Sequence, residues 1–110
     1  MRVYIAGPMT GKKLLNFPAF DETAAKIRAC GHTPVSPADF DRVMWPEYDY
    51  ASGSPPLGFN YELQLKIDLL LIETCEAVVF LPGWEDSRGA SLEYAWAQAL
   101  GLRTIKIGDL

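Results

Sequence analysis

The residues best suited to chemistry gather in one short segment, LPGWEDSRGASLE, at positions 81–93. Its last residue, Glu93, is a lone carboxylate in a small and apolar stretch with the pattern of a helix. Such a group can serve catalysis as a nucleophile or base, or it can be a solvated glutamate stabilised by the helix dipole. On spacing alone, a solvated position is the commoner one for Glu93, because other residues of the predicted helix are better suited to its core-facing side. These residues are Leu92, Ala95, Trp96 and Ala99.

Polar side chains just before this helix could hold a ligand. Asp86 and Ser87 are both suitable N-cap residues, and one cap is enough. The other could therefore bind a sugar hydroxyl or a phosphate, together with the Ser91 hydroxyl and free N–H groups near Gly89. Arg88 could add a positive charge there, or it could be an ordinary surface arginine.

Two polar residues in other parts of the sequence also stand out. Asp68 interrupts the apolar run IDLLLI, so it lies either on the solvent face of a helix or at a site. Tyr4 lies in the run RVYIA, which predicts a strand buried on both faces. A buried tyrosine hydroxyl needs a hydrogen-bond partner, which core packing of the ring does not supply.

Aromatic residues follow in the neighbouring loops. They could form a stacking wall for a base, although anchoring the loops is the commoner role. With Met9, the candidates are Trp45, Tyr48, Tyr50, Phe59 and Trp84. The only histidine, His32, is expected at the opposite end of the sheet, so we expect no histidine triad, no metal site and no cofactor.

The surrounding pattern predicts one α/β domain over residues 1–110. The predicted strands are 2–6, 32–35, 76–81 and 103–107, and the predicted helices are 18–30, 60–75 and 90–100. The apolar face of the second helix is assigned to Leu63, Ile67, Leu70 and Leu71. The segment 36–60 is rich in proline and aromatic residues and is predicted to be a long functional or mobile loop.

Strands that alternate with helices imply parallel βαβ units with right-handed crossovers. Pro34 places the second strand at an edge, so we expect the strand order 2-1-3-4. This is a flavodoxin-like or Rossmann-like three-layer sandwich with helices on both faces. Ligands of such sheets bind beyond the carboxyl ends of the strands, where the order reverses. Segments 7–11 and 82–93, which follow strands 1 and 3, should therefore carry the chemistry.

Composition narrows the range of partners. The chain has 110 residues and a net charge of -4, and no basic cluster exceeds Lys12-Lys13, so nucleic acid is not an expected partner. No apolar run is long enough to span a membrane and no signal-peptide pattern is seen, so we expect a cytoplasmic protein. A small anionic ligand is compatible with the acidic composition, because backbone N–H groups and one or two cations can bind phosphate.

The whole sequence resembles the nucleoside 2-deoxyribosyltransferase superfamily, which includes deoxynucleoside 5'-monophosphate N-glycosidases and short phage-encoded relatives. The resemblance is carried by YIAGPM at 4–9, by ID at 67–68 with CEAVV at 75–79, and by DSRGASLEYAWA at 86–97. It implies that Glu93 is a nucleophile that attacks C1' of deoxyribose, and that Tyr4 orients it. It also implies that Asp68 and Asp86 act near the leaving base and the sugar hydroxyls.

The loops that carry these motifs are expected to bind the substrate. The expected contacts are Gly7, Pro8, Met9, Trp84, Ser87, Gly89 and Ser91. Members of the family often have Gly-Thr before the nucleophile, and this sequence departs from that pattern. It has Gly89-Ala90-Ser91 instead, with Arg88 inserted after Asp86-Ser87.

The implied activity is cleavage or transfer of the N-glycosidic bond of 2'-deoxynucleosides or their 5'-monophosphates. The family's transferases use a polar residue from a neighbouring subunit's C-terminal tail, whereas this sequence ends at Asp109-Leu110, directly after its last strand. Hydrolysis is therefore expected at least as much as base exchange. Two alternatives stay open, a phosphoribohydrolase for ribonucleoside monophosphates and a nucleotide-binding or sensing module without catalysis. A homo-oligomer is also expected, with Trp and Tyr residues in 45–61 as a candidate interface or lid.

Overall fold

A single parallel sheet forms the centre of the molecule in the computed structural model, which describes residues 1–110. Its four strands lie in the order β2-β1-β3-β4, as the sequence predicted. The strands are β1 (Arg2–Ala6), β2 (Thr33–Val35), β3 (Ala77–Phe80) and β4 (Arg103–Lys106). This arrangement confirms the flavodoxin-like α/β fold, and it places β2 with Pro34 at an edge, where a missing N–H is tolerated.

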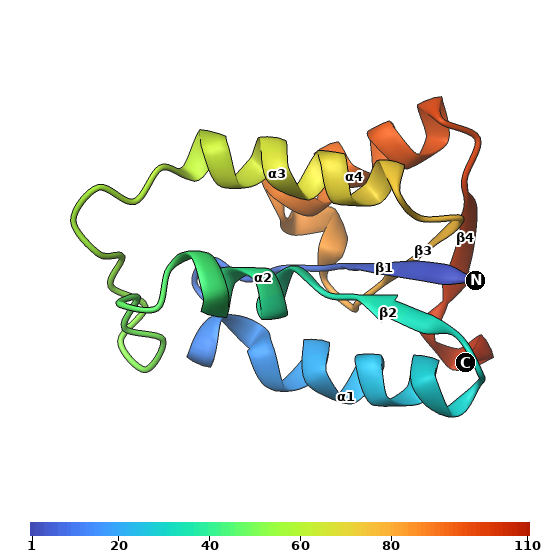
Figure 1. Ribbon diagram of the computed structural model, residues 1–110, viewed down its shortest axis with the longest axis horizontal. Coiled ribbons are helices and arrows are strands. Elements are labelled where there is room, and N and C mark those ends of the chain that lie inside the picture. The colour runs from blue at the N-terminus through green and yellow to red at the C-terminus, as the bar shows by residue number, and fades with distance from the viewer.

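Helices cover both faces of the sheet (Figure 1). They are α1 (Phe17–Ala29), α2 (Pro37–Met44), α3 (Tyr61–Glu73) and α4 (Arg88–Ala99). Because side chains alternate along a strand, Val3 and Ile5 of β1 pack with α1 on one face. Tyr4 packs on the other face in a cluster that includes Ile72 of α3 and Ala97 of α4. No helix is both long enough and apolar enough to cross a membrane.

The predicted loop 36–60 contains a helix that the sequence analysis missed. Residues 37–44 form α2, with Pro37 in its first turn, where a missing N–H costs nothing. Two turns with Pro37, Ala38 and Asp41 as the buried residues are too short for a clear periodic signal. The segment 45–60 then extends beyond the carboxyl ends of the strands before α3 returns (Figure 1).

The buried faces of α3 and α4 also differ from the prediction. Leu63 and Leu70 of α3 are 43% and 61% exposed, whereas Gln64 is buried. In α4 the buried residues are Ala90, Glu93 and Ala97, and the expected core residue Leu92 is 41% exposed. Both helices therefore turn a face with small or polar residues toward the carboxyl edge of the sheet.

Gly7 follows β1 at a point where the chain passes very close to Leu81. A Cβ atom at Gly7 would lie 2.7 Å from the Cβ of Leu81, closer than such atoms can approach. Gly7→Ala is therefore expected to lower the free energy of unfolding by about 1–3 kcal/mol, as overpacking does in well-packed cores. Urea denaturation measures the change.

Gly108→Ala is the matched control, since a Cβ at Gly108 would meet no atom within 4 Å. If both alanine variants unfold at the same urea concentration as the wild type, the close approach of Gly7 to Leu81 does not constrain the fold.

Candidate active site

One cavity lies at the carboxyl edge of the sheet, among β1, α2, α3 and α4. Its floor and walls come from the segment after β1, from α2 and the following loop, and from the facing parts of α3 and α4. Polar groups in its lining include Asp41, Gln64, Asp68 and Glu93. The cavity therefore collects polar side chains from three helices, α2, α3 and α4, at the sheet edge that the topology rule predicts.

Glu93 is buried at the bottom of this cavity. It is 5% exposed, and the hydroxyl of Tyr4, which is fully buried in β1, donates a hydrogen bond to its Oε2 atom. Burial raises the pKa of Glu93 well above its ordinary value, and the nearby charge of Asp68 raises it further. The hydrogen bond from Tyr4 acts in the opposite sense and favours the carboxylate. Glu93 is thus not a solvated glutamate, and the hydroxyl of Tyr4 has its partner.

Asp68 is held in place by a short chain of hydrogen bonds. The amide Nε2 of Gln64 donates to Asp68 Oδ1 at 3.0 Å, and the indole N–H of Trp45 donates to Gln64 Oε1 at 2.6 Å. These two bonds fix the orientation of the Gln64 amide. Burial raises the pKa of Asp68 to about 7, with a further contribution from the charge of Asp41. Asp68 can therefore both hold and release a proton near neutral pH.

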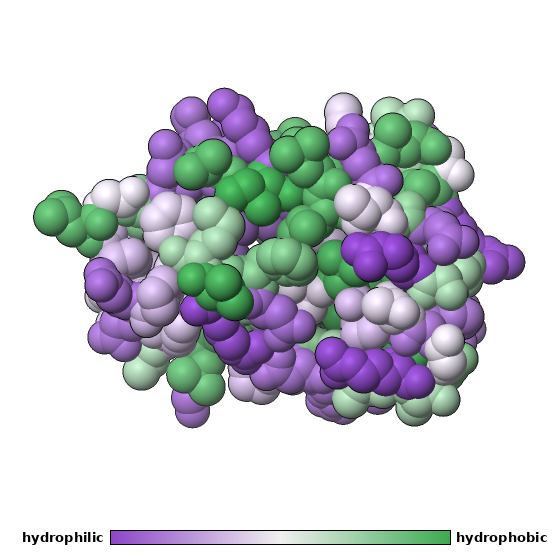
Figure 2. Space-filling view, viewed as in Figure 1, coloured by the Kyte–Doolittle hydropathy of each residue, from purple (hydrophilic) through white to green (hydrophobic).

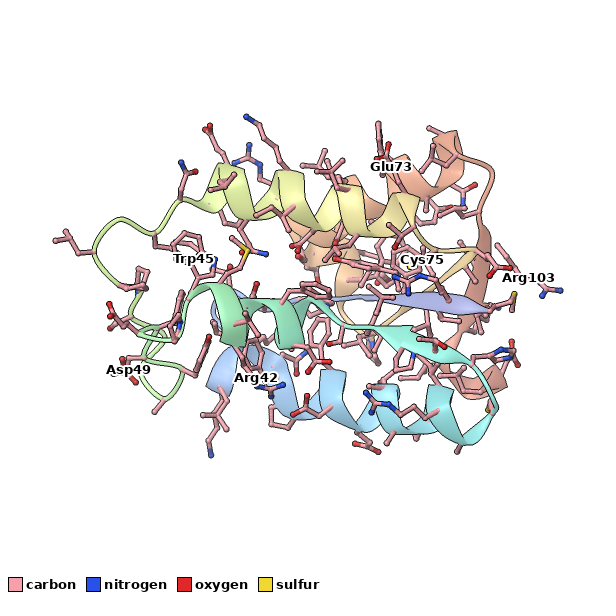
Figure 3. The ribbon with its side chains drawn as sticks, in the orientation of Figure 1. Arg42, Trp45, Asp49, Glu73, Cys75 and Arg103 are labelled. Carbon is pink, nitrogen blue, oxygen red and sulfur yellow. The ribbon has the colours of Figure 1, made fainter.

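Asp41 is a cavity residue that the sequence analysis did not identify. It lies in α2, is 8% exposed, and its Oδ1 atom has no hydrogen-bond partner. Burial raises its pKa to about 7. The neighbouring Arg42 points toward α1 (Figure 3), where it binds Asp21 at 2.7 Å. The spacing of Asp41 from Pro37 and Trp45, four residues either way, is the signal that could have placed it on an inward helical face.

Aromatic side chains form one wall of the cavity. Trp45 and Tyr48 both pack against Phe59, with ring centroids 4.9 and 5.3 Å apart, and all three line the cavity. Trp45 and Tyr48, which were also candidates for an interface or lid, are half-buried in this wall. Tyr50 packs on Phe17 and does not line the cavity.

Trp84 lies in a different place from the one expected. It stacks on Tyr94 at 4.8 Å between ring centroids and contacts Phe80, and it lines a separate hollow beside β4. Trp84 therefore does not line the cavity that holds Glu93.

The other expected site residues divide into two groups. Gly7, Met9, Ser87 and Gly89 line the cavity, and Ser87 caps α4 by accepting a hydrogen bond from the Ala90 N–H at 3.2 Å. The rest lie outside the cavity lining. Pro8 and the exposed Asp86 line a neighbouring hollow with Lys12 and Arg88, and Ser91 donates its hydroxyl to the backbone oxygen of Glu85.

Comparison with known proteins places this chain in a family. Residues 1–106 match the family described as Domain of unknown function (DUF4406). The chain belongs to the DUF4406 family. No curated protein matches its sequence.

A solved structure resembles the DUF4406 chain in fold. It is described as "2-desoxiribosyltransferase from Leishmania mexicana" and is 17% identical in sequence, with a TM-score of 0.64. The match covers 96% of the DUF4406 chain and 62% of the other chain. The DUF4406 chain thus has the fold of a deoxyribosyltransferase structure while spanning less than two thirds of it.

The buried carboxyls of the DUF4406 chain should make its stability depend on pH. The pKa values of Asp41 and Asp68 are raised from 3.8 to about 7 by folding, so between these pH values the folded protein keeps protons that the unfolded chain has lost. The free energy of unfolding is therefore expected to fall by a few kcal/mol as the pH rises from about 4 to about 7, at about 1.4 kcal/mol per pKa unit.

Urea denaturation between pH 4 and pH 8 measures this slope. Asp41→Asn should make the slope shallower, while Asp39→Asn, an exposed change on the same helix, should leave it as it is. A stability that rises with pH across this window would contradict the expectation.

Proposed function

We propose that this DUF4406 protein cleaves the N-glycosidic bond of 2'-deoxynucleosides or their 5'-monophosphates. The observation that carries the proposal is the buried Glu93, held by the Tyr4 hydroxyl in one cavity with Asp68. A nucleophilic carboxylate and a second carboxyl that can exchange a proton are what a retaining glycosidase needs. The shared fold with a protein named as a deoxyribosyltransferase supports the choice of sugar.

In the first step, an oxygen of the Glu93 carboxylate attacks C1' of the sugar. The bond from C1' to the base nitrogen breaks, its electron pair leaves with the base, and Asp68 gives its proton to the base. The reactive form has the proton on Asp68 and the negative charge on Glu93. The hydrogen bond from Tyr4 favours this form, because it stabilises the Glu93 carboxylate.

In the second step, the covalent ester between Glu93 and C1' is broken. A water molecule attacks C1' and loses a proton to the Asp68 carboxylate, which frees Glu93 and leaves the sugar with retained configuration. A second base could take the place of water, which would make the reaction a transfer. Asp86 is given no step, because it does not line the cavity.

The 5'-phosphate of a nucleotide would fit the hollow next to the cavity. Lys12 and Arg88 line that hollow together with Ser87 and Gly89, at the N-terminus of α4. Backbone N–H groups at a helix N-terminus and nearby cations attract phosphate, although the carboxylate of Asp86 opposes it. On balance we propose the 5'-monophosphate as the preferred substrate.

Incubation with paired substrates tests the proposal. Chromatography of free base released from deoxynucleosides, deoxynucleotides and the matching ribonucleotides, each with and without an acceptor base, separates hydrolysis, transfer and ribose-directed cleavage. Release from deoxynucleotides without an acceptor is the expected result. Tight binding of these compounds with no base released over hours would overturn catalysis and leave a binding module.

We also propose that the protein forms a homo-oligomer. Apolar side chains are exposed along the outer sides of α2 and α3, and apolar surface gathers over these helices (Figure 2). Exposed apolar surface of this kind favours burial against a partner. Light scattering after size exclusion measures the assembly, and a monomer at micromolar concentration would contradict it.

A further inference from the structure

Asp41 is a buried carboxylate that the two steps proposed above do not use. It lines the cavity while only 8% of it is exposed, and its Oδ1 atom has no partner. An unpartnered buried carboxyl oxygen costs stability, since it has lost water and gained no hydrogen bond in return. A ligand that donates a hydrogen bond to it would recover that loss.

No side chain of the protein donates a hydrogen bond to the carboxyl group of Asp41. The guanidinium of Arg42 binds Asp21 and Asp39, and the Tyr50 hydroxyl donates to the backbone oxygen of Asp41, not to its side chain. Gln64 gives one N–H of its amide to Asp68 and accepts from Trp45. Asp41 therefore lines the cavity without a hydrogen-bond donor from the protein on its carboxyl group, and a ligand bound in the cavity can supply one.

The position of Asp41 corresponds to the base end of the proposed substrate. It lies in the same stretch of chain as Trp45 and Tyr48, which form the aromatic wall with Phe59. All of these residues line the same cavity as Glu93, so a base stacked on the aromatic wall, with its sugar at Glu93, would lie beside Asp41.

We infer that Asp41 selects bases that carry an exocyclic amino group, by accepting a hydrogen bond from that group. This inference rests on the proposed function and names its substrate class. Adenine and cytosine carry their amino group on the same edge as a ring nitrogen, N7 and N3 respectively, that can take the proton from Asp68 as the base leaves. Hypoxanthine and uracil carry a carbonyl oxygen in that position, which would face the Asp41 oxygen without a hydrogen bond.

Base release from matched pairs tests the inference. The first pair is the 5'-monophosphates of deoxyadenosine and deoxyinosine. The second pair is the 5'-monophosphates of deoxycytidine and deoxyuridine. The assay is run at pH 8, where Asp41, with its pKa raised to about 7, is mostly ionised and can only accept. The wild type should then favour the amino member by roughly 10- to 100-fold in kcat/KM, the effect of one unpaired polar group in a site. Asp41→Asn should bring this ratio close to one, because a rotated amide can accept from an amino group or donate to a carbonyl. Asp39→Asn, on the exposed side of α2, should keep the wild-type ratio.

Calorimetry with the free bases gives a readout that does not need turnover. At pH 8, where Asp41 is mostly ionised, the wild type should bind adenine at least about 10-fold more tightly than hypoxanthine, and Asp41→Asn should lose this preference. If no substrate releases its base but this preference is seen, the proposed cleavage fails and the role of Asp41 stands. If bases are released from both members of each pair at equal rates, and Asp41→Asn changes neither ratio, the role of Asp41 is overturned while cleavage stands. Absence of both release and base binding overturns both.

Discussion

Glu93→Gln is expected to lower the rate of base release by about 10⁴-fold or more, since the change removes the nucleophile and keeps the shape of the side chain. The glutamine oxygen can still accept the hydrogen bond from Tyr4, so the local packing is preserved. The measurement is the initial rate of base release at saturating deoxynucleotide, with pre-steady-state mixing to detect any single turnover.

Stability separates loss of chemistry from loss of fold in this variant. Burial raises the pKa of Glu93, so its ionised form is unfavourable in the folded protein, and the neutral glutamine should unfold at a higher urea concentration above pH 7. Glu85→Gln is the control, because Glu85 is exposed and lies outside the cavity. Base release by Glu93→Gln at the wild-type rate would end the covalent mechanism.

Asp68→Asn is expected to lower the rate of base release by roughly 10²- to 10⁴-fold, the range that a general acid contributes. An asparagine can still interact with the Gln64 amide but has no proton to give to the leaving base. The loss should appear in kcat more than in KM, because protonation matters in the transition state and not in substrate binding.

The pH profile gives an independent check on Asp68. With its pKa raised to about 7, the wild-type rate of the first step should decline as the pH rises above 7 and the proton is lost. Asp68→Asn should remove this decline. Glu73→Gln, an exposed change in the same helix that Figure 3 shows on the outer side of α3, should keep it. A wild-type rate that rises through this range would show that Asp68 is not the acid.

The cavity combines three carboxyls, Asp41, Asp68 and Glu93, with no cationic side chain in its lining. Burial raises all three pKa values, and repulsion from a neighbouring carboxylate adds to the shifts of Asp68 and Glu93, so the free protein holds this site at a cost in stability. A substrate that takes one proton from Asp68 and gives one hydrogen bond to Asp41 would use both features.

The sequence alone determined the architecture of this protein. Runs such as RVYIA and EAVVFL predict buried strands, helical periodicity separates them, and Pro34 places one strand at an edge. These local signals are sufficient for the sheet order, because parallel strands with right-handed crossovers leave few topologies. They also locate the ligand site at the carboxyl edge, which is where the cavity lies.

Only the tertiary structure decided which side chains enter that cavity. Glu93 is buried with Ala90 and Ala97, although a larger apolar residue, Leu92, was available to the same helix. Hydrophobic periodicity reports the core face only where the neighbouring surface is apolar throughout, and α4 faces a partly polar cavity instead. The same reason applies to two other residues. Contacts between elements bury Asp41 in its two-turn helix and hold Trp84 outside the cavity, and no local sequence pattern records such contacts.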